Sequence, residues 1–379
     1  MSSPSQLRSR KTAQPDNVGS AWPDGVLQRL PVGTLQLESG AELPGVVLGY
    51  ETWGTLNEDA SNAVLVLHAL TGSAHVSRGS SNEDGWWEPL VGPGRAIDTD
   101  EMFVVAPNII GGCYGTTGPS SPAPDGAPWG SRFPHVTVRD SVSAEVHLAD
   151  ALGIGAWHTV VGGSMGGARA LEWAAMHPDR VSRCICVAGC AASTAEQIAF
   201  AQAQILAIRQ DPNFAGGDYY DGVAPAAGLG LARRIAHITY RSEPDLGARF
   251  GRLPQDTEEP LPQGDGGRGR YQVESYLDYQ AGKLAGRFDA NSYIVVTEAL
   301  TSHDLTRGRG SIADIFAGTG IEFVIAAVSS DRLYFPAESE RLVTELPPDV
   351  PVRLEMIDSP FGHDAFLIEA AQLSDIVRC

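Results

Sequence analysis

The sequence predicts an α/β protein with a mostly parallel central sheet and a helical insertion. Short apolar runs bounded by turn residues alternate with segments of helical periodicity, which is typical of strands buried on both faces of a sheet. The chain has 379 residues, of which 43% are hydrophobic, enough for one large domain with a packed core. No stretch approaches the ~18 consecutive apolar residues of a membrane span, so a transmembrane protein is excluded.

Eight strands are expected in order along the chain. Two β-like runs come first, the second alternating as VVLGYETW, and fully apolar runs follow. The expected strands are residues 33–38, 45–53, 63–67, 102–106, 158–161, 183–188, 322–328 and 352–357. Helical patterns lie between several of them, for example at 138–152 and 168–176, so strands and helices alternate as in a doubly wound sheet.

The pattern changes after the sixth strand, where IAFAQAQILAIRQ and GLGLARRIAHITYRS have the composition of helices. We therefore divide the chain into a core of residues 28–190 and 301–379 and a helical lid of residues 191–300. A lid at this point would cover the carboxyl ends of the strands, where open α/β sheets bind ligands. The Gly/Pro-rich stretch 254–269 is predicted to be a mobile loop, and the polar residues 1–27 a disordered N-terminus.

Charge and cysteine content narrow the class of protein further. A net charge of −19 opposes a nucleic-acid or anionic-membrane surface, because such binding needs Lys and Arg. The first residues lack the apolar run of a secretory signal, which predicts a cytoplasmic protein. Five cysteines fit a reducing compartment. Cys184, Cys186 and Cys190 could be read as metal ligands, but CICVAG is typical of a buried strand, so no metal is expected.

The clearest functional motif is HTVVGGSMGGARALEWA. A β-run ends at Val161, Gly162 to Gly166 match G-x-S-x-G around Ser164, and a helix begins at once. This strand, turn and helix context is that of a nucleophile elbow. The serine of such an elbow has strained backbone angles, and glycines two positions before and after it let strand and helix approach without side-chain clashes. Ser164 is therefore the predicted nucleophile. The alternative is that the motif is a plain glycine-rich turn between a strand and a helix, without a catalytic role.

A nucleophilic serine needs a base and an acid to orient that base. On a fold of this kind they follow the serine in the order Asp then His. Asp331 comes directly after the apolar run FVIAAVSS, and His363 comes after the run VRLEMI and before a final helix. Both strand-end loops meet at the edge of the sheet to which the elbow points, so Asp331 is the predicted acid and His363 the predicted base.

The oxyanion of an acyl-transfer reaction is expected to accept two backbone N–H groups. One belongs to the residue after the nucleophile, Met165, and the other to the loop His68–Gly72 after the third strand, with the Leu70 amide the best candidate. His68 itself is assigned no direct part in the chemistry, since a histidine at a strand end can pack or hydrogen-bond locally.

Motifs spread along the chain from about residue 30 resemble the homoserine O-acetyltransferase family. They are HALTG, GWW, GPGRAIDT, NIIGGCYGTTGPSSP, WGSRFPHVTVRD, GGSMGGARALEWA, LARRIAHITYRS, RFDANSYIVVTEAL, HDLTRGRG, SDRLYFP and GHDAFL. Ordinary esterases share G-x-S-x-G and the order of the three catalytic residues, but not NIIGGCYGTTGPSSP or LARRIAHITYRS. The resemblance implies an α/β-hydrolase fold with a helical lid, and acyl transfer from acyl-CoA to the hydroxyl of homoserine on the way to methionine.

The resemblance also implies roles for individual residues. The family's nucleophile, acid and base fall on Ser164, Asp331 and His363, and its arginine for the substrate carboxylate falls on Arg233, with Tyr240 further along the same helix. Asp364 falls where the family places the acid for the substrate amine. A zwitterionic amino acid needs one cation and one anion held apart, which Arg233 and Asp364 would supply. Arg233 and its neighbour Arg234 face about 100° apart on a helix, so only one is expected to point into the site.

The function predicted from these features is a homoserine O-acetyltransferase that uses acetyl-CoA as co-substrate and no bound cofactor. The expected mechanism is ping-pong through an acyl-serine. Three rivals stay open at this point: a homoserine O-succinyltransferase, a serine O-acyltransferase and, from another class, a carboxylesterase. A non-catalytic binding module is disfavoured because all three catalytic residue types are present. The family implies small-molecule substrates and a homodimer formed through the lid helices.

Overall fold

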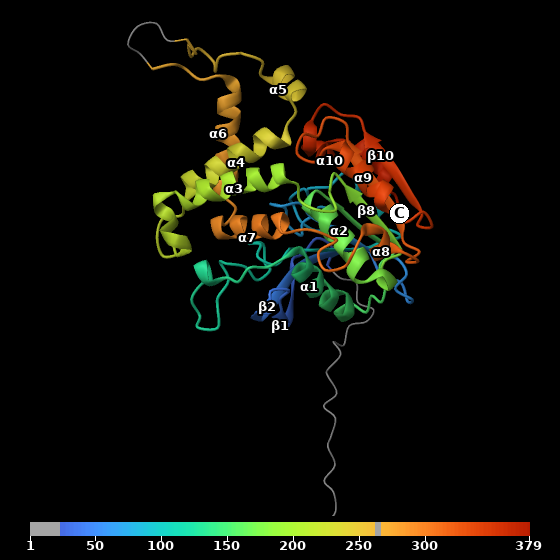
Figure 1. Ribbon diagram of the computed structural model, residues 1–379. Helices are drawn as coiled ribbons and strands as arrows, with labels where there is room; N and C mark the ends of the chain where they lie inside the picture. Colours follow the sequence, from blue (N-terminus) through green and yellow to red (C-terminus); the bar gives the residue numbers. More distant parts are fainter. Residues whose placement is uncertain (1–22, 262–266) are drawn as a thin grey trace, which may run out of the picture.

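The structure is a computed structural model that describes residues 23–261 and 267–379 (Figure 1). Most of the N-terminal segment 1–27, predicted to be disordered, lies outside the described residues, as do residues 262–266 of the predicted mobile loop. No helix in the described ranges is long and apolar enough to cross a membrane.

In the described ranges, an eight-stranded sheet forms the centre of the molecule, with strand order β1-β2-β6-β3-β7-β8-β9-β10. Its strands are β1 (Gln28–Gln36), β2 (Glu42–Trp53), β3 (Ala63–Leu67), β6 (Phe103–Pro107), β7 (Thr159–Gly163), β8 (Arg183–Val187), β9 (Glu322–Val328) and β10 (Val352–Ile357). β2 runs antiparallel to both β1 and β6, and every other pair is parallel. The predicted mostly parallel sheet is therefore confirmed.

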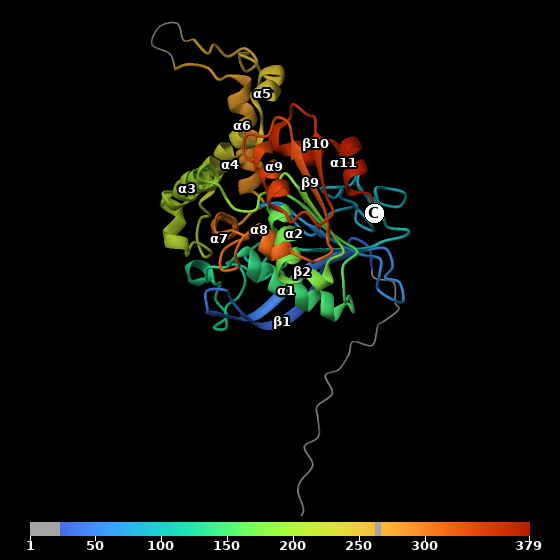
Figure 2. The same cartoon turned by 45° about the vertical axis from the view of Figure 1, so that its right-hand side comes forward.

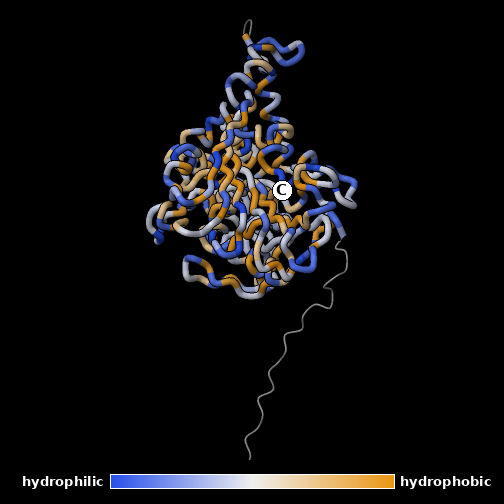
Figure 3. The backbone as a smooth tube through the Cα atoms, turned by 90° about the vertical axis from the view of Figure 1, so that its right-hand side faces the viewer, coloured by the Kyte–Doolittle hydropathy of each residue, from blue (hydrophilic) through white to orange (hydrophobic). Residues whose placement is uncertain are grey.

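Two apolar layers cover the two faces of the sheet. On one face, α1 (Val138–Ala151), α2 (Met165–Met176) and α9 (Pro336–Glu345) contribute to one buried cluster. On the other face, α10 (Ala365–Ile368) and α11 (Ala370–Val377) pack into a second cluster. The tube in Figure 3 shows hydrophobic segments through the middle of the molecule and hydrophilic segments in the outer loops. Burial of both faces explains why β3, β6 and β7 consist of wholly buried residues.

The boundaries differ from the predicted ones at a few places. β1 begins at Gln28, before the predicted 33–38, because it pairs with β2 along most of its length despite register shifts near Gly33. α2 begins at Met165, directly after the elbow, rather than at residue 168. Two strands of two residues each, β4 (Val91–Gly92) and β5 (Ile97–Asp98), form a separate small sheet that has too short a pattern to predict.

Five helices of the described residues lie between β8 and α8 (Ile312–Phe316) and form the helical insertion. They are α3 (Ala195–Arg209), α4 (Ala226–Tyr240), α5 (Glu243–Arg249), α6 (Gln272–Ala285) and α7 (Ala290–Thr301). α3 starts with a capping box between Thr194 and Gln197, which satisfies backbone groups at its first turn. α4 packs between α3 and α6, and Figures 1 and 2 show the group to one side of the sheet, with α5 and α6 furthest out.

Candidate active site

Ser164 lies on a sharp turn between β7 and α2. Its backbone angles, φ 58° and ψ −122°, are strained for a residue with a side chain. The turn requires glycine on both sides: a Cβ on Gly162 would lie 2.3 Å from the carbonyl carbon of Gly166, and one on Gly166 would lie 2.0 Å from the carbonyl oxygen of Leu67. The strand and the helix therefore approach in the way that the G-x-S-x-G spacing predicted, and they leave the Ser164 hydroxyl at the carboxyl end of the sheet.

Ser164, His363 and Asp331 meet at this edge of the sheet. Nε2 of His363 lies 2.8 Å from Oγ of Ser164, and Nδ1 of His363 lies 2.6 Å from Oδ2 of Asp331. Since a carboxylate accepts, Nδ1 carries the proton and Nε2 is free to accept the proton of the serine hydroxyl. His363 and Asp331 are almost fully buried. The geometry is that of a nucleophile, a base and the acid that orients the base.

The acid and the base are each held by neighbours that the sequence did not single out. Oδ1 of Asp331 accepts the backbone N–H groups of Leu333 and Tyr334 at 2.8 and 2.9 Å, which fixes the carboxylate. The ring of Tyr334 stacks on the imidazole of His363, with centroids 4.8 Å apart and an interplanar angle of 17°. Tyr334 lies in the motif SDRLYFP, but nothing in the spacing of that motif indicates a stacking partner for the base.

The two expected oxyanion donors, the backbone N–H groups of Leu70 and Met165, both flank Ser164. In the part of the chain that the structure describes, neither N–H has a hydrogen-bond acceptor. Met165 is the first residue of α2, so its N–H is one of the helix's unpaired donors and the positive end of the helix dipole adds to it. Two unused N–H donors close to a nucleophile are what an oxyanion requires.

His68 holds the loop that presents Leu70. Its Nδ1 lies 2.7 Å from the carbonyl oxygen of Ala69, an acceptor, and its Nε2 accepts the backbone N–H of Ile109 at 3.1 Å. This arrangement fixes the neutral imidazole with its proton on Nδ1. Burial, together with the charge of Arg169, lowers the pKa of His68 to about 3. The Ala69 carbonyl also accepts the N–H of Gly72 at 2.9 Å, so it is held by two donors.

Arg233 and Tyr240 lie on the face of α4 that looks toward the nucleophile. The guanidinium carbon of Arg233 is 5.7 Å from the centre of the Tyr240 ring, and that ring is 5.9 Å from the imidazole of His363. Nε of Arg233 is buried without a hydrogen-bond partner among the described residues. Arg234 instead pairs with Asp278 of α6 at 2.7 Å, on another side of the helix. Of the two arginines, Arg233 is therefore the one that faces the site.

Asp364 lies beside His363, but its charge is shared with a residue that the sequence analysis missed. Oδ2 of Asp364 is 3.1 Å from Nε of Arg241, the residue that follows α4. Burial raises the pKa of Asp364 above its ordinary value, while the charge of Arg241 opposes that shift. Arg241 directly follows Tyr240, the last residue of α4. Its contact with Asp364 depends on how the chain turns there, which the sequence does not reveal.

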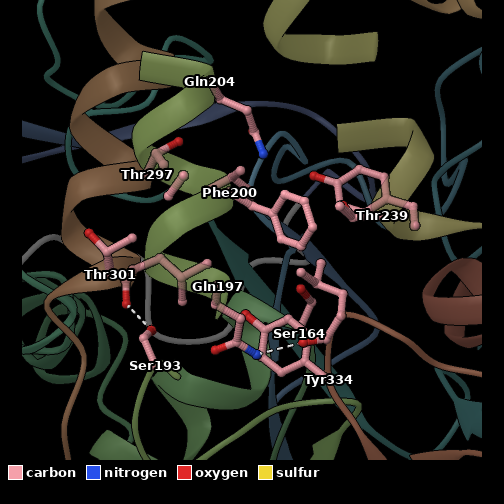
Figure 4. A pocket seen from close by; sticks show the side chains of 14 residues that line it. Ser164, Ser193, Gln197, Phe200, Gln204, Thr239, Thr297, Thr301 and Tyr334 are labelled. Atoms are coloured by element: carbon pink, nitrogen blue, oxygen red, sulfur yellow. Dashed lines mark hydrogen bonds between the residues drawn. The ribbon is translucent and has the colours of Figure 1, made fainter. Parts of the chain in front are cut away.

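A pocket opens from Ser164 between α3 and α7, and Figure 4 shows the side chains that line it. About 510 Å³ of space not filled by atoms lies in the pocket and at its mouth, open solvent included. The lining residues are Leu70, Ser164, Ser193, Gln197, Phe200, Ala201, Gln204, Thr239, Tyr240, Thr297, Leu300, Thr301, Leu333 and Tyr334. Arg233 and Asp364 are not among them. Except for Leu70, Ser164 and Tyr240, none of these residues was expected to contribute to the site.

The three cysteines that could be read as metal ligands are buried residues of the core. Cys184 and Cys186 belong to the buried strand β8 and Cys190 follows it, and burial raises the pKa of all three thiols. All five cysteines of the chain are free. Within the described ranges, no group of three or more His, Cys, Asp or Glu side chains could hold a metal ion.

A sheet of this topology with a serine elbow and strand-end Asp and His residues defines a protein of the α/β-hydrolase class. Residues 62–370 match the family model for the alpha/beta hydrolase fold. The homoserine O-acetyltransferase of Thermobifida fusca is 55% identical over 349 residues, which cover 91% of this chain and 90% of the relative. This chain belongs to the homoserine O-acetyltransferase family, so the resemblance drawn from its motifs is confirmed.

Solved structures of two kinds have the same fold. The homoserine O-acetyltransferase of Bacillus anthracis superposes with a TM-score of 0.85 at 27% identity, over 93% of this chain and 98% of that one. Esterase E22 superposes with a TM-score of 0.83 at 26% identity over the same shares. The fold therefore serves both transferases and esterases, and the side chains around Ser164 must distinguish them.

Proposed function

We propose that this protein transfers an acetyl group from acetyl-CoA to the hydroxyl of L-homoserine through an acyl-serine, a step toward methionine. The observation that carries the proposal is the contact of His363 with both Ser164, at 2.8 Å, and Asp331, at 2.6 Å. Membership of the family supports the choice of substrates. Acetyl-CoA acts as a co-substrate, and the protein needs no resident cofactor for this chemistry.

In the first half-reaction, His363 takes the proton of Ser164 and the serine oxygen attacks the thioester carbon. The N–H groups of Leu70 and Met165 stabilise the oxyanion that forms. Collapse of this intermediate breaks the carbon–sulfur bond, and the thiol of coenzyme A leaves with the proton from His363. Asp331 keeps the imidazole in the required tautomer and stabilises its positive charge while it holds the proton.

In the second half-reaction, homoserine takes the place of coenzyme A. His363 removes the proton of its hydroxyl, which attacks the acyl-enzyme and yields O-acetyl-homoserine and free Ser164. Arg233 would bind the substrate carboxylate and Asp364 its ammonium group, with Tyr240 between them. The free Nε of Arg233 and the position of Asp364 next to the base support these roles.

Transfer competes with hydrolysis of the acyl-enzyme, so water must be kept from Ser164. The serine side chain lies under α3, α4 and α7, the residue is only 6% exposed, and the helical insertion would act as the lid. A carboxylesterase needs no zwitterion site, whereas this chain places Arg233, whose Nε has no partner among the described residues, and the half-buried carboxylate of Asp364 near the base. We therefore favour the transferase over the esterase.

The experiment that tests this function is a thiol-release assay that crosses acetyl-CoA and succinyl-CoA with homoserine and serine. We expect release that depends on both acetyl-CoA and homoserine. Rapid hydrolysis of simple esters, with no dependence on coenzyme A, would instead establish an esterase. Faster release with succinyl-CoA or with serine would establish one of the other two transferases.

We also propose that the protein is a cytoplasmic homodimer formed through the lid. Ile198 and Leu206 of α3, and Leu231 and Ile238 of α4, are large apolar side chains exposed on two adjacent helices. Such a surface is favourable for contact with a second copy. Analytical ultracentrifugation should give a dimer mass, and Leu231→Glu with Ile238→Glu should give a monomer. The five free cysteines fit a reducing compartment.

A further inference from the structure

The pocket beside Ser164 is deeper than an acetyl group requires. Gln197, Ala201 and Gln204 line it along α3 and span two helical turns, about 10 Å at ~1.5 Å per residue. Figure 4 shows Ser164 at one end of the set of side chains and Gln204 at the other, with Phe200 between them. The methyl carbon of an acetyl group lies only about 1.5 Å beyond the carbonyl carbon. Most of the pocket would remain unused by an acetyl-enzyme.

The pocket has no charged wall. None of its fourteen lining side chains, all from the described residues, is Asp, Glu, Lys, Arg or His. Its polar groups are neutral hydroxyls and amides, and Phe200, Leu300 and Leu333 supply apolar surface. A group that enters this pocket must therefore be uncharged, because an unpaired charge in a buried, neutral site is unfavourable.

The end of the pocket that lies furthest from the nucleophile is closed. Gln204 is 7% exposed, Thr297 3% and Thr239 2%, so protein covers them. Behind them the hydroxyl of Tyr293, a wholly buried residue, donates to Oε1 of Gln204 at 2.5 Å. Oγ1 of Thr297 is buried without a partner among the described residues, so this part of the wall carries one hydroxyl that no protein group satisfies.

Homoserine, the arm of coenzyme A and the acyl chain must all be placed around Ser164, and only the acyl chain fits this pocket. Homoserine carries two charges, which the neutral walls would not match. The arm of coenzyme A is uncharged but must lead out to its phosphates in solvent, and a closed end does not allow that. The acyl chain is uncharged and ends within the site. From these observations, which rest on the proposed function, we propose that the pocket binds the acyl chain and that the protein also transfers straight, uncharged acyl groups longer than acetyl.

The chemical step for a butyryl group is the same as for acetyl. Oγ of Ser164 forms a bond to the thioester carbon, the carbon–sulfur bond breaks, and the thiol leaves with the serine proton delivered by His363. The hydroxyl of homoserine then forms the new ester bond, gives its proton to His363, and Ser164 regains a proton. No oxidant, reductant or further reactant is needed. Only the atoms beyond the carbonyl carbon, which lie in the pocket, differ between the two substrates.

The first test compares acetyl-, butyryl-, hexanoyl- and succinyl-CoA with saturating homoserine. We expect kcat/KM for butyryl-CoA to lie within about tenfold of the acetyl-CoA value, because burial of the added CH₂ groups offsets their loss of freedom. Succinyl-CoA has the same acyl length as butyryl-CoA but ends in a carboxylate. We expect kcat/KM for succinyl-CoA to be at least about a hundredfold below that for butyryl-CoA, since the pocket holds no counter-charge.

The possible outcomes separate this proposal from the proposed function. If acetyl-CoA is used and butyryl-CoA is not, the pocket does not receive the acyl chain and the proposal is wrong. If succinyl-CoA equals or exceeds butyryl-CoA, the argument from the neutral walls is wrong. If acetyl-CoA itself supports no transfer to homoserine, the proposed function fails instead.

The second test narrows the pocket. Ala201 is 7% exposed and lies between Gln197 and Gln204, whereas Ala199, two residues earlier on α3, is exposed and does not line the pocket. Ala201→Leu should lower the ratio of butyryl to acetyl turnover at least about tenfold by filling the space that the longer chain needs. The matched control Ala199→Leu should leave the ratio unchanged. Since the ratio is measured in one preparation, a loss of folded protein cancels.

A third test uses Thr297→Val, in which the side chain keeps nearly the same shape but loses its hydroxyl. It removes the unpartnered hydroxyl and should raise the ratio of hexanoyl to acetyl turnover several-fold, because the end of a longer alkyl chain would no longer bury an unsatisfied oxygen. A fall in that ratio would overturn the assignment. If Ala201→Leu lowers the turnover of acetyl and butyryl substrates equally, the pocket holds another part of the substrate and the proposal also fails.

Discussion

Nε of Arg241 lies 3.1 Å from Oδ2 of Asp364, and this ion pair joins the end of α4 to the loop that carries His363. The same two segments meet again where the hydroxyl of Ser242 donates to the carbonyl oxygen of Pro360. Gly362 fits between them only because it has no Cβ, which would lie 2.6 Å from the carbonyl oxygen of Tyr240. The position of the base is therefore coupled to the position of the lid.

The role of Asp364 can be tested by Asp364→Asn. If Asp364 binds the ammonium group of homoserine, the variant should lose about ten- to a hundredfold in kcat/KM for homoserine, since a hydrogen bond to a charged group contributes about 1.5–3 kcal/mol. The burst of acetyl-enzyme formation should stay near the wild-type rate. Stopped-flow measurement of the burst and steady-state turnover separate the two effects. An equal loss in both half-reactions would show that Asp364 acts on His363 rather than on the substrate.

The pair also predicts a pH dependence. Because burial raises the pKa of Asp364 above its ordinary value of 3.8, its carboxyl takes up a proton at a higher pH than an exposed aspartate. The protonated form does not attract an ammonium group, so KM for homoserine should rise as pH falls through that raised pKa. Arg241→Gln removes the charge that opposes the shift and should move this rise to higher pH. An unchanged profile in Arg241→Gln would contradict the coupling of the two residues.

Much of the fold could be predicted because the strands of a buried parallel sheet are short, wholly apolar and ended by polar or glycine residues. β3 and β9 were located to the residue for this reason. The same property predicted the region of the site, since Ser164, Asp331 and His363 each follow a strand and the carboxyl ends of parallel strands meet at one edge. Positions set by strand ends depend on local sequence and are therefore visible in it.

Contacts made by the helical insertion could not be predicted in the same way. Gln197 and Gln204 are polar residues on α3 and would be expected to face solvent, yet both are buried and line the pocket that opens from Ser164. The pairing of Arg241 with Asp364 depends on how the chain turns after α4. Such positions follow from the packing of α3, α4 and α7 over the sheet, which no short stretch of sequence specifies.

Ser164→Ala should abolish acetyl transfer while the fold remains. The change removes one hydroxyl from a turn whose backbone is held by Gly162 and Gly166, so thermal unfolding should be unchanged. The remaining donors and binding groups are expected to leave only about 10³–10⁴-fold catalysis over the uncatalysed rate. Mass spectrometry of the wild type with acetyl-CoA alone should find one acetyl group on the Ser164 peptide. Retention of more than a few per cent of the activity would exclude the covalent mechanism.

His68 should act through the backbone of the oxyanion loop. In a planar trans peptide the carbonyl and the N–H point in opposite directions, so the two donors that hold the Ala69 carbonyl also direct the Leu70 N–H. His68→Phe removes one donor to Ala69 and the acceptor of the Ile109 N–H. We expect both half-reactions to slow by about ten- to a hundredfold, less than the 10²–10³-fold loss of a whole oxyanion donor.

The KM for homoserine should change little in His68→Phe, because no substrate contact is removed. The shape of the pH profile should also be retained, since an imidazole with a pKa of about 3 stays neutral where the enzyme works. His147→Gln, a change at an exposed position of α1, serves as the control. A rise in KM without a fall in either rate would place His68 at the substrate instead.

Arg233 distinguishes a transferase for homoserine from an esterase. If its guanidinium binds the homoserine carboxylate, Arg233→Ala should slow the second half-reaction by about ten- to a hundredfold and spare the first, because formation of the acyl-enzyme does not use that contact. Arg233→Lys should recover little, since an ammonium group does not reproduce the two parallel hydrogen bonds of a guanidinium. Arg234→Ala is the matched control, because Arg234 pairs with Asp278 away from the site. A loss confined to the acetylation burst would assign Arg233 to coenzyme A, and no loss in either phase would leave the carboxylate of homoserine to another cation.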